Sequence, residues 1–172
     1  MQIGIMSDTH NKLTAVHQAL EILRARKISQ IVHCGDLTNE RLLQQFYGFS
    51  LYLAFGNADF ATGAISLAVK KLDREGLTGE NLGFSLDARQ FFVTHGHYPA
   101  RLQHAIDSGR YDYILTGHTH TFRDERQGRC RVINPGALGG NKGNYSFAIL
   151  DIELDLLERF LVGKDEGYLA KL

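Results

Sequence analysis

The first third of the chain alternates between short apolar runs and longer amphipathic stretches. The run QIGIMS (2–7) is almost continuously apolar, as expected for a strand that is buried on both faces of a parallel sheet. SQIVHC (29–34) and LYLAF (51–55) predict two further strands, and helices are predicted from Asn11 to about Lys27 and from Glu40 to Tyr47. This alternation predicts right-handed βαβ units in a parallel sheet.

The first of these helices has a single apolar stripe. Leu13, Val16, Leu20 and Leu23 fall on one helical face, which predicts the side that packs against the sheet. His17 borders this stripe, and we expect it to take part in the packing.

The middle of the chain has a less regular pattern. In order, it predicts a short amphipathic helix, a hairpin, a second helix and a strand, at 64–75, 82–86 with 90–94, 99–108, and 111–116. The hairpin turns at 87–89, and the second helix has Pro99 in its first turn and Gly109 past its end, as helix termini prefer.

After Thr121 the pattern becomes one of strands alone. TFRDER, RCRVIN, YSFAILDI and LERFLV are separated by turn residues. A parallel α/β half followed by antiparallel strands predicts an α/β fold of two stacked mixed β-sheets flanked by helices, an α/β/β/α sandwich. Because the sequence contains no repeat or linker, we expect one domain over residues 1–172.

Composition and charge narrow the function classes. The 172 residues with 44% hydrophobic content suffice for one domain with a full core. The formal net charge of zero provides no overall basic field to attract nucleic acid, although a nucleotide substrate stays possible. Cys34 and Cys130 lack CxxC spacing and are expected to be buried small hydrophobes. Without a basic leader or a stretch long enough to span a membrane, the chain is expected to be cytoplasmic.

Polar side chains able to bind metal follow five of the predicted strands. These residues are Asp8 and His10, Asp36, Asn57 and Asp59, His95 and His97, and His118 and His120. One such cluster alone is explained by a capping aspartate or a solvated loop histidine. Because ligands bind outside the carboxyl ends of strands in open α/β sheets, five clusters at one edge predict a common site.

The types of side chain indicate a catalytic transition-metal site. Imidazole, carboxylate and amide ligands suit Mn, Fe, Co, Ni or Zn better than Ca, and the absence of thiolate favours an exchangeable site. Two divalent ions bring four positive charges, of which Asp8, Asp36 and a hydroxide would remove three. The remaining positive charge would attract an anion such as phosphate.

The ordered set of motifs resembles the calcineurin-like metallophosphoesterases, above all their small single-domain bacterial and archaeal phosphodiesterases. The motifs are Asp8-x-His10, Gly35-Asp36, Gly56-Asn57-x-Asp59, His95-Gly96-His97 and Gly117-His118-x-His120, and the resemblance extends to INPGALG at 133–139.

This resemblance implies a dinuclear centre. One metal would be held by Asp8, His10, Asp36 and His120, and the other by Asp36, Asn57, His95 and His118. Asp36 would bridge the two ions, and the amide of Asn57 would also touch a phosphate oxygen. The resemblance implies a metal-bridging hydroxide that attacks phosphorus in line. Manganese is the first expectation for the metal, with Ni, Co, Fe and Zn open.

One position departs from the pattern of larger members. Many of these have a histidine after the motif asparagine, assigned as the general acid, where this chain has Ala58. We expect His97 or water to protonate the leaving group, and substrates with acidic leaving groups to be favoured.

The remaining polar residues near the motifs have simpler interpretations. Asn11 is expected to cap the first helix, Asp59 to stabilise a turn, and His104 to lie on a solvated face. For His33 an orienting role and a satisfied core histidine are both open. The 133–140 loop is placed near the cleft by the resemblance.

A phosphodiesterase acting on a small phosphate ester is therefore the preferred hypothesis. Phosphomonoesterase, cyclic nucleotide phosphodiesterase and nuclease activities stay open, with a nuclease disfavoured by the neutral charge. From other classes, the alternatives are a catalytically silent scaffold, as in the retromer subunit of similar fold, and a phosphate-sensing protein. Resemblance to small members suggests a homodimer or homotetramer.

Overall fold

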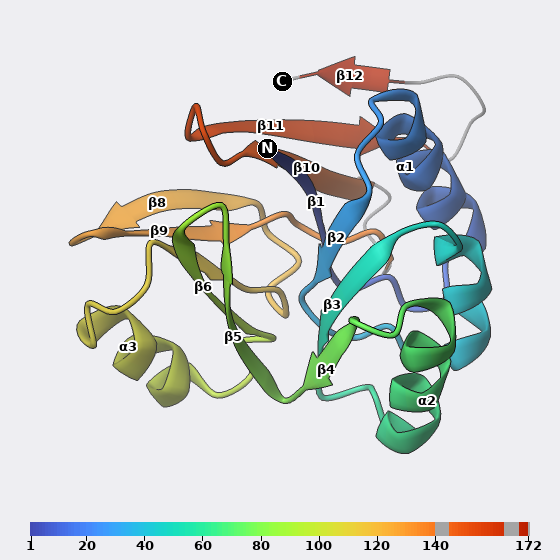
Figure 1. Ribbon diagram of the computed structural model, residues 1–172, viewed down its shortest axis with the longest axis horizontal. Helices are drawn as coiled ribbons and strands as arrows, with labels where there is room; N and C mark the ends of the chain where they lie inside the picture. Colours follow the sequence, from blue (N-terminus) through green and yellow to red (C-terminus); the bar gives the residue numbers. More distant parts are fainter. Residues whose placement is uncertain (140–144, 164–168, 172) are drawn as a thin grey trace.

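The computed structural model describes residues 1–139, 145–163 and 169–171, and its strands form two stacked sheets (Figure 1). The elements in chain order are β1 (Gln2–Met6), α1 (Leu13–Ala25), β2 (Gln30–His33), η1 (Glu40–Phe46), β3 (Ser50–Ala54), α2 (Thr62–Leu72), β4 (Leu77–Gly79), β5 (Asn81–Leu86), β6 (Arg89–Thr94), α3 (Pro99–Asp107), β7 (Tyr113–Leu115), β8 (Arg123–Gln127), β9 (Cys130–Asn134), β10 (Tyr145–Asp151), β11 (Leu156–Val162) and β12 (Leu169–Lys171).

Both sheets are mixed. In the described part of the chain the larger sheet has seven strands in the order β12-β11-β10-β1-β2-β3-β4, and β1, β2, β3 and β4 are parallel. The smaller sheet has five described strands in the order β5-β6-β7-β9-β8, with β6, β7 and β9 parallel. The parallel strands of each sheet therefore end at one edge, and the loops that follow β1, β2, β3, β6 and β7 contain the predicted site residues.

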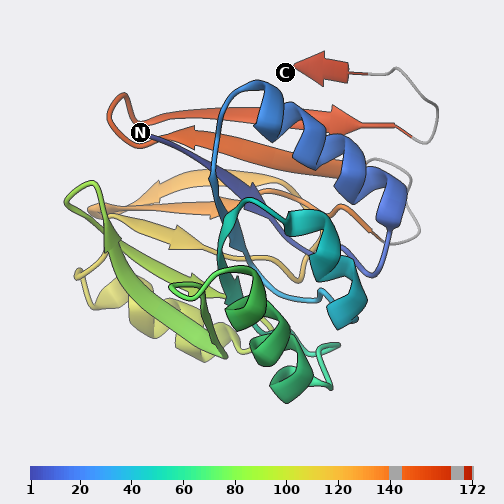
Figure 2. The same cartoon turned by 45° about the vertical axis from the view of Figure 1, so that its right-hand side comes forward.

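Three apolar layers hold the sandwich together. Helices α1, η1 and α2 cover the outer face of the larger sheet, with Leu20 and Leu23 of α1 in the core beneath them (Figure 2). Between the sheets, Ile5 and Val32 belong to the same core as Val93 and its neighbours on the smaller sheet. Helix α3 packs through Ala105 on the opposite face of the smaller sheet. This architecture confirms the predicted α/β/β/α sandwich.

Several elements differ from the sequence prediction. The segment at Glu40–Phe46 forms a 3₁₀-helix, not an α-helix. The sequence pattern does not predict strands β4 and β12, each of which has three residues. Both lie at the edges of the larger sheet.

The predicted stripe of α1 is correct only from its second turn onward. Leu13 begins the helix and is 54% exposed, whereas Ala15 and Ala19 join the buried face beside Val16. The prediction that His17 packs is wrong, because its side chain is exposed. The predicted Asn11 cap is also wrong. The helix has Lys12 at its N-cap, without a side-chain cap.

The hairpin of β5 and β6 turns through Asp87 and Ala88, both with positive φ (49° and 60°). Two consecutive left-handed residues define the type I′ turn, whose twist matches that of the flanking strands. The predicted hairpin is therefore confirmed, and Arg89 belongs to the second strand.

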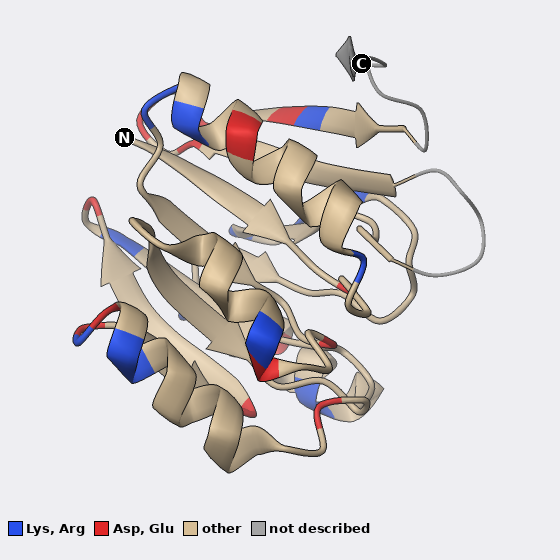
Figure 3. Cartoon of the chain, turned by 90° about the vertical axis from the view of Figure 1, so that its right-hand side faces the viewer, with Lys and Arg blue, Asp and Glu red and all other residues tan. Residues whose placement is uncertain are grey.

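Charged residues are dispersed over the helical face. Figure 3 shows lysine and arginine interspersed with aspartate and glutamate, in keeping with the formal net charge of zero. Among the described residues, none of the helices is both long and apolar enough to cross a bilayer.

Candidate metal centre

The loops at the ends of the parallel strands have an unusual backbone. Positive φ is adopted by Asp8 (51°), His10 (40°), Asp36 (57°), His118 (67°) and His120 (57°). A non-glycine residue in this region costs about 1–3 kcal/mol and persists only where the surroundings impose it. Five of the residues that the sequence predicts as ligands are therefore strained, although positive φ also occurs elsewhere in the described chain.

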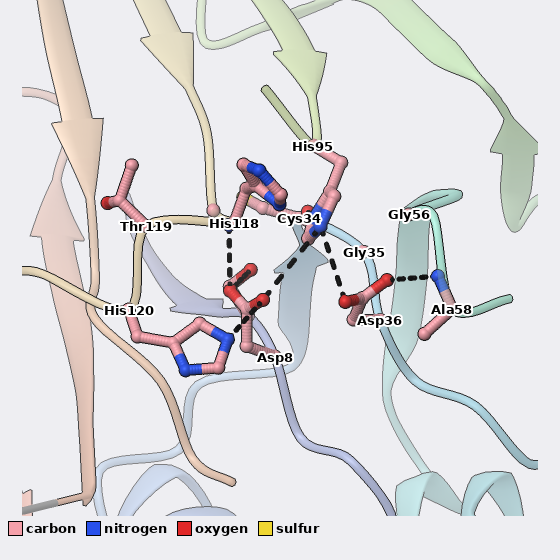
Figure 4. Close-up of polar contacts among 12 residues, drawn as sticks. Asp8, Cys34, Gly35, Asp36, Gly56, Ala58, His95, His118, Thr119 and His120 are labelled. Carbon is pink, nitrogen blue, oxygen red and sulfur yellow. Dashed lines mark hydrogen bonds and ion pairs between the residues drawn. The ribbon is translucent and has the colours of Figure 1, made fainter. Parts of the chain in front are cut away.

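Asp8 is buried, and its two carboxylate oxygens have different surroundings (Figure 4). Oδ2 accepts hydrogen bonds from Ser7 Oγ (2.6 Å) and from the backbone N–H of His118 (3.0 Å). Oδ1 is buried without a hydrogen-bond partner. It faces Nε2 of His120 at 3.1 Å, and Nε2 of His10 and of His95 at 3.9 Å each. One oxygen orients the carboxylate, and the other is free to bind a cation.

The two carboxylate oxygens of Asp36 also have different surroundings. Its Oδ1 accepts from the backbone N–H of Ala58 at 2.8 Å, and its Oδ2 lies 3.4 Å from Nε2 of His95 and 3.7 Å from Nε2 of His10. Burial alone would raise the pKa of Asp36, but interaction with His95 and the Ala58 N–H lower it to about 2. The group is therefore a carboxylate at neutral pH.

His95 is fully buried and held in one orientation. Its Nδ1 lies 2.8 Å from the carbonyl oxygen of Cys34, so Nδ1 has the proton and donates it to that acceptor. The opposite nitrogen, Nε2, points toward both carboxylates and is buried without a hydrogen-bond partner. Metal-binding histidines commonly donate their second N–H in this way. Burial lowers the pKa of His95, yet Asp36 and Asp8 outweigh it and raise the pKa, so the site favours positive charge here.

The donor set fits divalent metal. Within the described residues, two groups have ligand atoms within 4.8 Å of one another: Asp8 with His10 and His120, and Asp8 with Asp36 and His95. The unpartnered atoms Asp8 Oδ1 and His95 Nε2 belong to these groups. A cation would satisfy both atoms, which otherwise stay buried at a cost in free energy. Asp8 is common to the two groups, and Asp36 Oδ2 also faces imidazoles of both.

Three predicted site residues lie beside these groups. The ring of His118 is 5.2 Å from the ring of His95, and the ring of His97 is 5.5 Å from the same ring, between centroids. Nδ1 of His97 is buried and unpartnered. Asn57 is exposed on the turn that precedes Ala58, whose N–H binds Asp36.

Asp59 stabilises the neighbouring turns, as predicted. Its buried carboxylate accepts hydrogen bonds from the backbone N–H groups of Asp36 (2.9 Å), Thr38 (2.7 Å) and Gly56 (2.8 Å). It therefore connects the loop after β2 to the loop after β3.

Residues 133–139 lie against the centre, as the sequence prediction had it. The amide of Asn134 donates to the carbonyl oxygen of Gly117 (2.7 Å), and an added Cβ at Gly139 would meet the backbone of Asp8 and Thr9. Gly140, the last residue of the predicted 133–140 loop, lies outside the described residues.

Sequence reasoning missed Ser7, which donates the 2.6 Å hydrogen bond to Asp8. Ser7 lies at the end of an apolar run, and the neighbouring residues in the sequence do not indicate this contact. A clue lies in Gly117, where any Cβ would collide with Ser7 Oγ and Asp8 Oδ2, so this close approach requires glycine.

His104 and the two cysteines lie where the sequence predicts. His104 is exposed on α3, as predicted. Cys34 and Cys130 are buried and free, also as predicted.

Comparison with known proteins identifies the family of the chain. The model of the calcineurin-like phosphoesterase superfamily domain matches residues 1–155. The chain is 34% identical over 156 residues to phosphodiesterase MJ0936 of Methanocaldococcus jannaschii, covering 89% of this chain and 94% of that protein. It is 25% identical over 175 residues to phosphodiesterase YfcE of Escherichia coli, covering 88% and 89%.

A solved structure of an archaeal phosphodiesterase superposes with a TM-score of 0.90 at 32% identity, covering 94% of this chain and 100% of the other. Fold and family match thus agree. The chain belongs to the calcineurin-like phosphoesterase superfamily and is a metal-dependent phosphoric ester hydrolase.

Proposed function

We propose that the protein is a phosphodiesterase with two divalent metal ions at the ends of the parallel strands. The observation that supports this proposal most is that the two carboxylate oxygens of Asp8, and likewise those of Asp36, have different partners. Each has one oxygen fixed by N–H or O–H donors and the other directed at imidazole nitrogens. The relatives named phosphodiesterases support the diester preference.

The proposed ligands follow the strand ends. Asp8, His10, Asp36 and His120 would hold one ion, and Asp36, Asn57, His95 and His118 the other. The position of Asp36 Oδ2 between His10 and His95 supports a bridging role. Such ions, when bound, supply Lewis acidity and a nucleophile at neutral pH. Manganese is the first proposal for the metal, with Ni, Co, Fe and Zn as alternatives, because carboxylate, amide and imidazole donors without thiolate suit ions of this group.

The chain's own residues would then bind and orient the phosphate. Asp8 and Asp36 supply two negative charges, and the proposed histidine and asparagine ligands are neutral when they bind metal. The loaded centre is therefore positive and attracts an anionic ester. Asn57 is exposed on the turn before Ala58, and its amide would contact a phosphate oxygen.

Either water or His97 is the proposed proton donor to the leaving group. Burial and the neighbouring rings of His95 and His118 lower the pKa of His97, so little of it is protonated at neutral pH. We therefore expect kcat/KM to fall steeply as the leaving-group pKa rises across a series of aryl phosphodiesters. A flat dependence would contradict this account, because it requires an efficient acid.

We also propose that the chain acts as one domain. Ile5 and Val32 of one sheet and Val93 of the other contribute to one core between the layers, so neither sheet is covered without its partner.

The test is hydrolysis of bis-p-nitrophenyl phosphate and p-nitrophenyl phosphate by protein stripped with chelator and refilled with Mn²⁺. We expect metal-dependent diester turnover that exceeds monoester turnover. Asp36→Asn should abolish it, while Asp107→Asn, at an exposed carboxylate on α3, should leave it unchanged. No turnover by metal-loaded protein with Mn²⁺, Co²⁺, Ni²⁺ or Zn²⁺ would refute the proposal.

A further inference from the structure

His33 is a fully buried polar side chain whose hydrogen bonds go to Gly35 and Thr9, neither of which is a proposed ligand. It ends β2, three residues before Asp36, and its ring packs edge-on against Phe46. Its Nδ1 lies 3.2 Å from the backbone N–H of Gly35, and its Nε2 lies 3.2 Å from Thr9 Oγ1. Both ring nitrogens are therefore satisfied, by two different ligand-bearing loops.

These contacts define the tautomer of His33. A backbone N–H can only donate, so Nδ1 must be the acceptor and have no proton. The proton of the neutral ring is then on Nε2, which donates to the hydroxyl of Thr9. A second proton on Nδ1 would face the Gly35 N–H. In agreement, burial, followed by the charge of His95, lowers the pKa of His33 to about 3.

Thr9, in the loop after β1, also contacts the loop after β2. It lies between Asp8 and His10, and its hydroxyl, once it accepts from His33, is free to donate to the carbonyl oxygen of Asp36, at a weak 3.5 Å. Backbone hydrogen bonds run parallel to it, from the Asp8 N–H to the Gly35 carbonyl (2.9 Å) and from the His10 N–H to the Asp36 carbonyl (3.1 Å).

We propose that His33 is a positioning residue, which with Thr9 clamps the loop after β1 to the loop after β2 and thereby sets the metal affinity of the centre. The proposal rests on the metal centre described above. Asp8, His10 and Asp36 are all held at strained positive φ, so their turns need an external restraint. His33 and Thr9 supply it from the interior, where water cannot replace them.

Two substitutions separate the parts of this clamp. In His33→Asn, the shorter side chain can still accept from the Gly35 N–H, as in an Asx-turn, but it cannot reach Thr9. Thr9→Val removes the hydroxyl and preserves the shape. His104→Asn, on the exposed face of α3, is the matched control.

The experiment is calorimetric titration of metal-free proteins with Mn²⁺, with thermal unfolding measured on the same samples. We expect each variant to bind Mn²⁺ at least about tenfold more weakly, the effect known for residues that orient metal ligands. The double variant should be no weaker than the worse single one, because both break one connection. His104→Asn should bind like the wild type.

Folded variants that bind Mn²⁺ within twofold of the wild type would overturn the clamp while leaving the proposed enzyme intact. Additive losses would also overturn it, since they indicate independent effects. A wild type that binds no Mn²⁺ would overturn the metal centre itself, and the clamp with it. As a second readout, long-range ¹H–¹⁵N spectra of the metal-free protein should show His33 protonated on Nε2 alone between pH 5 and 8. Protonation on Nδ1 would overturn the proposal.

Discussion

At the scale of single residues, the candidate centre depends on carboxylates whose oxygens are not equivalent. Asp8 and Asp36 each use one oxygen for a hydrogen bond that fixes the group and leave the other toward the histidines. Asp59 differs, because both of its oxygens accept backbone N–H groups and neither is free. Its role is therefore to hold the turns, not to bind metal.

Asp59→Asn tests this assignment. The amide keeps one acceptor but directs an NH₂ group at the N–H donors of either Thr38 or Asp36 and Gly56. We expect the free energy of unfolding to fall by about 2 kcal/mol, as for the loss of hydrogen bonds to a charged group. Urea denaturation measures it, with Asp107→Asn as control. An unchanged midpoint would show that the turns do not need the carboxylate.

At the scale of elements, the loops determine more of the site than the strands do. The strands bring the ligand-bearing turns to one edge, and His120, which has a positive φ, places its Nε2 3.1 Å from Asp8 Oδ1. The hairpin turn at Asp87 and Ala88 has the same left-handed conformation but lies outside the site.

Relief of strain at that turn should stabilise the protein. Ala88→Gly places glycine at φ 60°, where a Cβ is unfavourable, and completes the Asp-Gly pair that type I′ turns prefer. We expect a gain of about 1 kcal/mol in the free energy of unfolding. Ala64→Gly, at an exposed position of α2, should lower it by up to about 1 kcal/mol. A loss of stability in Ala88→Gly would contradict the assigned turn.

Long elements and ordered motifs were predictable from sequence, whereas short and tertiary features were not. Apolar runs and turn residues predict the strand at residues 2–7 and the hairpin. The order of the motifs predicts that the candidate ligands lie at strand ends. The contact of Ser7 with Asp8 depends on a distant glycine, Gly117, and no local pattern encodes it. The exposure of Leu13 likewise depends on where α1 meets the sheet.

At the scale of the whole molecule, the two ends of the sandwich have different roles, one in metal binding and the other in stability. The metal centre lies where the parallel strands end. Asp112 precedes β7 at the opposite edge, and it accepts hydrogen bonds from the Gln90 N–H (2.8 Å) and from Arg129 (3.0 Å). The hydrogen bond from the Gln90 N–H lowers the pKa of Asp112. Burial opposes this shift, and Arg129 adds to it.

The stability that Asp112 provides should depend on pH. Because its pKa is lower in the folded state, the contribution is fully present above the unfolded value of about 3.9 and is lost as the pH falls through the folded pKa. We expect Asp112→Asn to cost about 1 kcal/mol at pH 7 and progressively less below pH 4. Urea denaturation from pH 2 to 7 measures the difference, and diester turnover should not change. A difference independent of pH would contradict the assignment.

The most direct test of the central claim is anomalous diffraction from crystals of the protein soaked with Mn²⁺. The account predicts two peaks in the cluster, one beside His10 and His120 and the other beside His95, with Asp36 between them. A single peak, or manganese bound elsewhere in protein that hydrolyses diesters, would contradict a dinuclear centre at these strand ends.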